Sequence, residues 1–153
     1  FNLNFMNEKG EKERAVMIHA AITGSLERFM SILIEHVAGK FPLWLSPEQI
    51  RVLTITDRSN EYAEEICKKL TEAGLRASVD PKSHSISKKV REAQLAKVNY
   101  MVTLGDKEVE KKTLSIRTRD GKVKFDVKVE DFIKDLKKEV EDSLKLKMEI
   151  WLS

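Results

Sequence analysis

Short apolar runs alternate with amphipathic helical runs between Ile50 and Val140, and this alternation constrains the fold more than any other feature of the chain. The pattern predicts strands at 50–55, 75–79, 100–104, 114–118 and 123–127. Between the first two of these runs, apolar residues recur at helical spacing, as at Tyr62, Ile66 and Leu70. Strands that alternate with helices and end in a hairpin predict an α/β domain, a mixed sheet with helices on its faces.

The remaining elements follow from the same periodicity. Residues 2–6 and 14–20 predict a hairpin around a turn-rich segment, and a helix is expected from Leu26 to a stop at Gly39. Residues 40–48 hold two prolines and no period, so they predict a connector. Further helices are expected from Ser59 or Asn60 to Gly74, over about 87–97 and from Val129, with a short turn or helix over 106–110. Asp120-Gly121 is expected at the tip of the last hairpin.

Composition limits the class of protein. At 153 residues and 41% hydrophobic content, the chain can bury one core, or one domain and part of another. Its one cysteine, Cys67, excludes an internal disulfide and suits a reducing compartment. No apolar run is long enough for a membrane span, and no signal peptide is visible. Because the chain starts at Phe1 within an expected strand, we expect a fragment of a longer cytoplasmic protein without membrane association.

Charge is distributed unevenly along the chain. The net charge is only +3, but the window from Arg76 to Lys128 holds 14 Lys and Arg residues against 7 Asp and Glu. Such a basic region is typical of a nucleic-acid-binding surface, and equally of a solvated surface in a lysine-rich protein.

The stretch MIHAAITGSLERF, from Met17 to Phe29, predicts a strand that breaks at Gly24 and becomes a helix with Arg28 in its first turn. The first amide groups of a helix lack partners within it, and the helix dipole is positive at that end. A cation beside such a junction suits a negatively charged ligand.

The segment MIHAAITGSLERFMSILIEHVAGKFPLWLSP, residues 17–47, resembles the end of the catalytic domain of threonyl-tRNA synthetases and the hinge that follows it. The resemblance continues through KKVREAQLAKVNYM, LGDKEVE and SIRTRDGKV. It implies that residues 1–39 are the last segment of a class II catalytic domain. It also implies that residues 40–153 are an anticodon-binding domain with a five-stranded mixed sheet flanked by helices.

The resemblance also assigns catalytic-domain residues. His19, which on an apolar strand would otherwise be read as a core histidine, corresponds to one of three ligands of the catalytic zinc that selects threonine. Arg28 corresponds to the arginine beside the ATP phosphates, and Ser25 lines the same site; ATP would bind with magnesium. Since the other two zinc ligands of the family are absent from this sequence, the chain alone is not expected to hold zinc tightly or to be active.

For anticodon recognition, the resemblance assigns Lys88, Arg91, Glu108 and Arg117. Glu108 could accept from the Watson–Crick edge of guanine, while arginines hold phosphates or base acceptors. Ser83 replaces an asparagine of the family pattern, and its shorter side chain puts the contacts of that loop in doubt. Without the resemblance, Lys88, Lys89 and Arg91 would be read as an ordinary exposed helix face.

The implied function is that of the C-terminal part of a threonine–tRNA ligase, homodimeric at full length, with tRNA(Thr), threonine and ATP as partners. Two alternatives remain open. One is an anticodon-binding-like interaction module that serves no synthetase, and the other is the same domain of a prolyl-, glycyl- or histidyl-tRNA synthetase. A small-molecule-binding α/β domain is less favoured because no Gly-rich phosphate loop follows a parallel strand.

Overall fold

The computed structural model describes residues 2–21 and 23–152, with side chains described as far as Ser143. The chain divides into two compact units, Phe1–His36 and Val37–Ser153, which we call unit 1 and unit 2.

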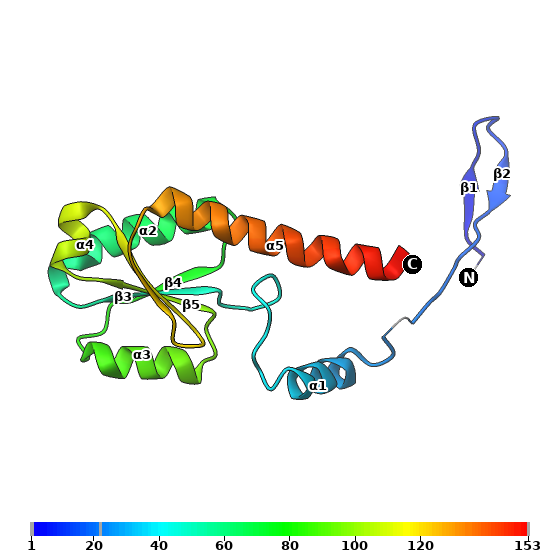
Figure 1. The fold of residues 1–153 in the computed structure, drawn as a ribbon. Coiled ribbons are helices and arrows are strands. Elements are labelled where there is room, and N and C mark those ends of the chain that lie inside the picture. The colour runs from blue at the N-terminus through cyan, green and yellow to red at the C-terminus, as the bar shows by residue number, and fades with distance from the viewer. Residues whose placement is uncertain (1, 22, 153) are drawn as a thin grey trace. The chain divides into compact units, whose positions relative to one another are not determined.

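Unit 1 contains a β-hairpin followed by one helix (Figure 1). Strand β1 (Asn4–Met6) pairs antiparallel with β2 (Lys12–Arg14), and the helix is α1 (Leu26–His36). The side-chain oxygen of Asn7 accepts hydrogen bonds from the backbone N–H groups of Lys9 and Glu11, at 3.0 and 2.9 Å, and so closes the turn. The expected hairpin and helix are therefore both present.

The expected strand over 14–20 is wrong beyond Arg14. Residues 15–21 have no regular secondary structure, and the side chains of Val16 and Ile18 are each 89% exposed. A segment becomes a strand only where a neighbour satisfies its backbone N–H and C=O groups, and no described residue does so for residues 17–20. The expected strand–glycine–helix junction is an irregular segment with Gly24 at φ +66°, followed by α1.

Unit 2 is built on a five-stranded mixed sheet, as expected (Figure 1). Its strands are β3 (Ile50–Thr54), β4 (Ala77–Asp80), β5 (Tyr100–Leu104), β6 (Leu114–Thr118) and β7 (Val123–Val127). In space they follow the order β4-β3-β5-β6-β7. Strands β4, β3 and β5 are parallel, and β6 and β7 continue the sheet antiparallel.

Helices connect and cover these strands. They are a short 3₁₀ turn η1 (Asp57–Ser59), then α2 (Asn60–Glu72), α3 (Ile86–Leu95), α4 (Asp106–Lys111) and α5 (Val129–Leu152). Helix α2 ends before Gly74, whose φ of +86° is the left-handed conformation that commonly closes a helix. Helix α5 continues through residues 145–152, although the side chains of that tail lie outside the described ones.

Two hydrophobic clusters hold unit 2 together, one on each side of the sheet. The larger cluster packs helix residues such as Ile66 of α2 and Phe132 of α5 against alternate strand residues such as Val102 and Leu104 of β5. The smaller one joins α3 to the other side; it contains Leu53, Ala93, Val98 and Met101. Since side chains alternate across a strand, the two clusters identify the two faces of the sheet.

The contact between α5 and the sheet includes an aromatic pair and a polar anchor. The rings of Tyr100 and Phe132 meet edge to face with centroids 5.7 Å apart, and the Tyr100 hydroxyl donates to Glu139 at 2.6 Å. Burial and this hydrogen bond raise the pKa of Tyr100.

Among the described residues, no helix has the length and apolar character that a membrane span requires.

Candidate nucleic-acid interface

One face of the sheet in unit 2 is only partly covered by a helix. Strand register places Met101, Arg117 and Val123 side by side across β5, β6 and β7, on the same face as the α3 cluster. Helix α3 covers this face over β3 and β5, whereas Val123 on β7 is 37% exposed. We call the part of this face beyond α3 the open face; it is carried by the exposed Val123 and Phe125 and the half-buried Arg117, together with the buried Ser115.

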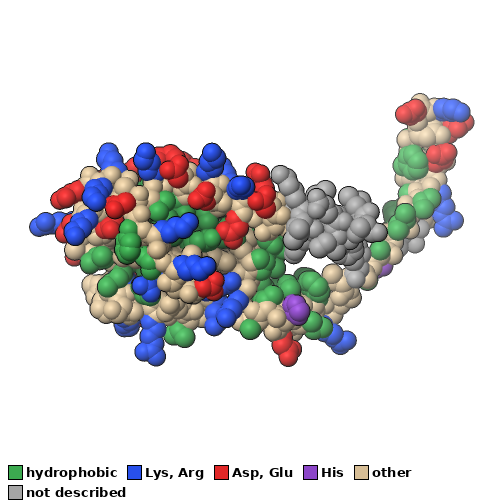
Figure 2. All heavy atoms as spheres, viewed as in Figure 1, with side chains coloured by type: hydrophobic (Ala, Val, Ile, Leu, Met, Phe, Trp, Pro, Cys, Tyr) green, Lys and Arg blue, Asp and Glu red, His purple; other side chains and the backbone are tan. Residues whose placement is uncertain are grey.

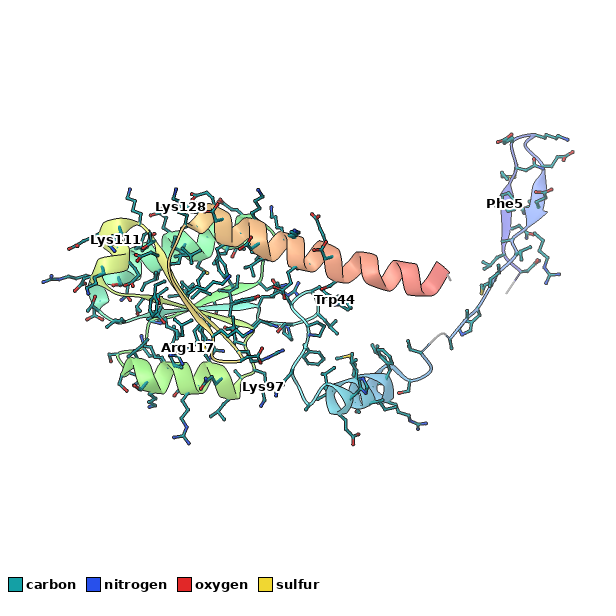
Figure 3. All side chains as sticks on the ribbon, viewed as in Figure 1. Phe5, Trp44, Lys97, Lys111, Arg117 and Lys128 are labelled. Carbon is teal, nitrogen blue, oxygen red and sulfur yellow. The ribbon has the colours of Figure 1, made fainter. Side chains whose placement is uncertain are left out.

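Arg117 lies within the open face (Figure 3). Its side chain is half-buried, and in the described part of the chain no hydrogen bond or ion pair holds its guanidinium group. A guanidinium is always charged and presents several donors in a fixed plane, which match a phosphate or the acceptor edge of a base. A half-buried and unpaired arginine on a sheet face is therefore suited to bind an external acceptor.

Basic side chains also follow the segment that leads into and along α3. Residues 82–97 hold five Lys and Arg residues and one Glu. Figure 2 shows basic side chains along the lower side of unit 2, where α3 lies, while both signs mix over α2, α4 and α5. Such an unbalanced helix face attracts a polyanion.

Three of the expected contact residues belong to this segment. Ser83 is exposed in the loop between β4 and α3, and Arg91 is exposed on α3 with no recorded partner among the described side chains. Lys88 Nζ lies 3.2 Å from His84 Nε2 and 4.0 Å from Glu92 Oε1. The structure leaves all three accessible.

Lys89 is not part of an exposed helix face, contrary to the reading from sequence. It is 2% exposed, and its ammonium group donates to the backbone oxygens of Thr54 and Asp80 at 2.8 and 3.1 Å. Thr54 Oγ1 accepts as well, at 3.2 Å. Lys89 therefore joins the carboxyl ends of β3 and β4 to α3, and it positions the loop that carries Ser83.

Glu108 lies at the start of α4, after the carboxyl end of β5. Its Oε2 accepts from the backbone N–H of Gly105 at 3.0 Å and so caps the start of the helix. Asp106 in the same turn accepts from Thr56 at 3.1 Å and so links α4 to the end of β3. Ligands of α/β proteins bind at such an edge, where connections leave neighbouring parallel strands for opposite sides of the sheet.

The five expected RNA-contacting residues thus come from the β4–α3 loop, α3, α4 and β6. No hydrogen bond or ion pair among the described side chains joins any two of them. Three of them lie on α3 or on the loop before it, and the other two lie on α4 and β6, the two elements that follow β5 in the chain. Each remains available to an external ligand, apart from the Glu108 oxygen used in the cap.

The expected catalytic-domain residues lie in unit 1. His19 is exposed in the irregular segment, and Arg28 is exposed on α1. Ser25 acts at the start of α1, where its hydroxyl donates to Glu27 at 2.9 Å and accepts from the Arg28 backbone N–H at 3.4 Å. Within the described residues, no group of three His, Cys, Asp or Glu side chains is arranged to hold a metal.

Two exposed apolar residues beside these elements escaped the sequence analysis. Ile55 follows β3 and approaches Gly105, and Phe125 projects from β7. The alternation of Val123, Phe125 and Val127 suggests one buried side, but a bulge interrupts the pairing between β6 and β7. No sequence pattern signals that bulge directly.

Comparisons with known proteins identify the family of the chain and its fold. Residues 49–139 match the protein family described as "Anticodon binding domain". Over 136 residues the chain is 52% identical to a threonine–tRNA ligase from Protochlamydia amoebophila, a match that covers 89% of the chain and 21% of that protein. The chain spans about a fifth of the length of the curated relatives it matches.

Solved structures show the same fold. A crystal structure of the RNA binding domain of threonyl-tRNA synthetase from Cryptosporidium parvum matches with a TM-score of 0.71 and 34% identity, over 90% of this chain and 35% of that one. Prolyl-tRNA synthetase from the same organism matches with a TM-score of 0.65 and 20% identity, over 91% of this chain and 30% of that one. At that identity the second likeness concerns the fold alone.

Proposed function

Because the chain belongs to the anticodon-binding domain family, we propose that it is the C-terminal part of a threonine–tRNA ligase and that unit 2 recognises the anticodon of tRNA(Thr). The observation that carries this proposal is the 52% identity to a threonine–tRNA ligase over 136 residues. That stretch is longer than unit 2, so it also includes part of unit 1. An interaction module that kept only the anticodon-binding fold would have no reason to retain unit 1.

In this proposal the anticodon loop lies on the open face and along α3. Arg117 binds a base edge or a phosphate, and Lys88 and Arg91 bind phosphates. Glu108 accepts from a base through the carboxylate oxygen that the helix cap leaves free. Base contacts provide sequence discrimination, whereas phosphate contacts provide affinity that is independent of sequence and sensitive to salt.

Unit 1 would belong to the last segment of the catalytic domain, and the anticodon-binding domain would begin near residue 40, just inside unit 2. The exposed apolar side chains of unit 1 support this assignment, since Met6, Val16, Ile18 and Leu26 have no apolar cover in the described structure. Arg28 would bind ATP phosphates, with Ser25 beside it, in the full-length enzyme. We propose that this enzyme activates threonine, is a homodimer and works in the cytoplasm, and that the chain alone is inactive.

A catalytic zinc would need donors that the described residues do not supply together. His19 offers one imidazole, and the absence of a three-residue donor group among the described residues means that the set visible here does not fit a zinc site by itself. We therefore assign His19 only as one ligand of a site completed elsewhere in a longer protein, and no step of the proposal passes through the metal.

The decisive experiment measures the affinity of the chain for a tRNA(Thr) transcript and for the same transcript with changed anticodon bases, at two salt concentrations. We expect tighter binding to the unchanged transcript at both. Equal binding to both transcripts would contradict anticodon recognition, even if binding weakened with salt, because phosphate contacts alone produce that result.

Variants assign the contacts. Arg117→Ala should lower the affinity by about 1–3 kcal/mol and reduce discrimination between anticodons, while Arg91→Ala should weaken binding to both transcripts alike. Glu108→Gln retains a side chain that can still cap α4, so a loss of discrimination without a loss of stability would identify a base contact. Lys68→Ala on α2 is the matched control, because Lys68 is an exposed cation away from the open face, and it should change neither quantity.

A further inference from the structure

Phe125 lies on the open face beside Arg117. Register pairs Ile116 with Lys124 and Arg117 with Val123, and Phe125 lies two residues beyond Val123 on the same strand, next to the point where the register shifts. It therefore shares the face of Ser115 and Arg117. Phe125 and Arg117 are diagonal neighbours across β6 and β7, a separation that an aromatic and a long side chain can span together.

The pairing of β7 with β6 shifts next to Phe125. Between the pairs Ile116–Lys124 and Leu114–Val127, Ser115 stands against two residues of β7, Phe125 and Asp126. Of these, Asp126 has a φ of +54°, a conformation that Asp tolerates better than most residues. Its carboxylate accepts from Lys111 Nζ at 3.2 Å and from the Thr113 hydroxyl at 3.5 Å. These contacts attach the bulge to the end of α4, the helix that carries Glu108. Figure 3 labels Lys111 at this end of the helix.

The residues around Phe125 indicate what kind of ligand its exposed ring could bind. It is 70% exposed, and a single exposed apolar side chain needs no explanation by itself. Here, however, Phe125 is a diagonal neighbour of Arg117, whose guanidinium has no partner among the described residues, and it shares its face with Val123, beyond the part of the sheet that α3 covers. An apolar partner protein would leave the Arg117 charge without a partner, whereas a nucleotide offers both a flat apolar base and an anion.

We propose that Phe125 is a stacking platform for one unpaired base of the tRNA anticodon loop, placed beside the base or phosphate that Arg117 binds. This inference rests on the proposed function and names a contact of the same surface. Every base has a π-face, so stacking adds affinity without distinguishing sequence. Phe125 thus holds the loop on the sheet, and Arg117 and Glu108 read it.

The test uses the chain and an RNA hairpin with the anticodon stem and loop of a tRNA(Thr), with 2-aminopurine at one loop position at a time. Phe125→Ala should weaken binding roughly tenfold. It should leave the slope of log affinity against log salt unchanged, because no phosphate contact is lost. At one loop position, the fluorescence quenching seen in the complex with the unchanged chain should disappear.

Three further variants separate stacking from other effects. Phe125→Tyr should retain affinity and quenching, while Phe125→Leu, which keeps an apolar side chain without a π-face, should lose both. Phe5→Ala, an exposed phenylalanine on a strand of unit 1, is the matched control and should change neither (Figure 3). Unfolding midpoints of all variants show whether a loss of binding reflects a loss of folding.

The outcomes distinguish the two proposals. If the unchanged chain binds the hairpin without regard to the anticodon, the proposed function fails, and the role of Phe125 fails with it. If binding depends on the anticodon but Phe125→Ala binds as tightly as the unchanged chain, only the stacking role is overturned. Retention of affinity by Phe125→Leu would also overturn it, since the contact would then be apolar rather than aromatic.

Discussion

Unit 1 and unit 2 both carry motifs of the family, but among the described residues only unit 2 buries a core. Every buried side chain among the described residues belongs to unit 2. In unit 1 the strands of the hairpin are exposed throughout, and none of the residues of α1 is buried. A family motif in unit 1 therefore does not indicate an independently stable structure.

A segment can therefore carry a sequence motif for binding or catalysis without burying a core that stabilises its own fold. In unit 2, alternating apolar residues find partners on α2, α3 and α5 within the same chain. In unit 1, α1 has 11 residues, a length at which an isolated helix is marginal in water. Its apolar stripe predicts burial that unit 1 by itself does not provide.

The largest expected effect comes from separating the units after His36. Residues 37–153 should unfold cooperatively in urea at the same midpoint as the whole chain, because they contain the complete core. Residues 1–36 should show no cooperative transition by far-ultraviolet circular dichroism. A sharp transition in the short piece, or a lowered midpoint in the long one, would break the comparison.

Substitution of one buried isoleucine should be costly only in unit 2. Ile66 is fully buried between α2 and the sheet, so Ile66→Ala should reduce the free energy of unfolding by about 2–5 kcal/mol. Ile32 on α1 is 61% exposed, and Ile32→Ala should change it by less than about 0.5 kcal/mol. Urea unfolding of both variants gives the two values, and similar values would contradict the contrast between the units.

Removing a buried polar contact of unit 2 should also lower the free energy of unfolding, but by less than removing a buried isoleucine. Lys89→Met removes the ammonium group that the oxygens of Thr54 and Asp80 accept from, and should cost about 1–3 kcal/mol. Lys88→Met, one residue away on the exposed side of α3, should leave the unfolding midpoint nearly unchanged. If the two lysines behaved alike, the buried position of Lys89 would be wrong.

The smallest expected effect depends on pH. Burial acts to raise the pKa of Glu48, but hydrogen bonds from Arg51 and Ser78 outweigh it and hold the pKa below its usual range. Because the unfolded chain then takes up a proton more readily, Glu48 stabilises the fold above about pH 4.5, and the contribution is lost as the pH falls through the folded pKa.

Glu48→Gln should therefore lower the stability by about 1 kcal/mol or less near neutral pH, with the difference closing in acid. Urea midpoints measured between neutral and acidic pH provide the comparison. Glu27→Gln in unit 1 is the control. The backbone and Ser25 hydrogen bonds lower the pKa of Glu27, but this exposed carboxylate should leave the unfolding midpoint unchanged at every pH. A gap for Glu48→Gln that persisted in acid would exclude this linkage.

Much of unit 2 could be predicted because its signals are local. The strands Tyr100–Leu104, Leu114–Thr118 and Val123–Val127 match the expected ranges residue for residue, since each is a short apolar or alternating run bounded by a turn. Strand β4 was expected at 75–79 but occupies Ala77–Asp80. Its limits are set by pairing with β3, a contact between residues far apart in the chain.

Some features of the candidate site could likewise be predicted from the sequence, and others could not. The basic character of the α3 segment and the presence of Arg117 could be read directly, because charge is a property of composition. The burial of Lys89 could have been suspected from its helical spacing with Ile86 and Ala93, but its three acceptors lie at the ends of two other strands. Helical spacing cannot show whether such acceptors exist.

The sequence by itself determined the α/β class, the order of the elements and the family of the chain, because periodicity and motifs are local in the chain. Only the tertiary structure decided which apolar residues become buried, why residues 15–21 form no strand, and that Arg117 and Phe125 share an uncovered face. Those outcomes depend on which distant segments meet, and the free energy of burial and hydrogen bonding is decided where they meet.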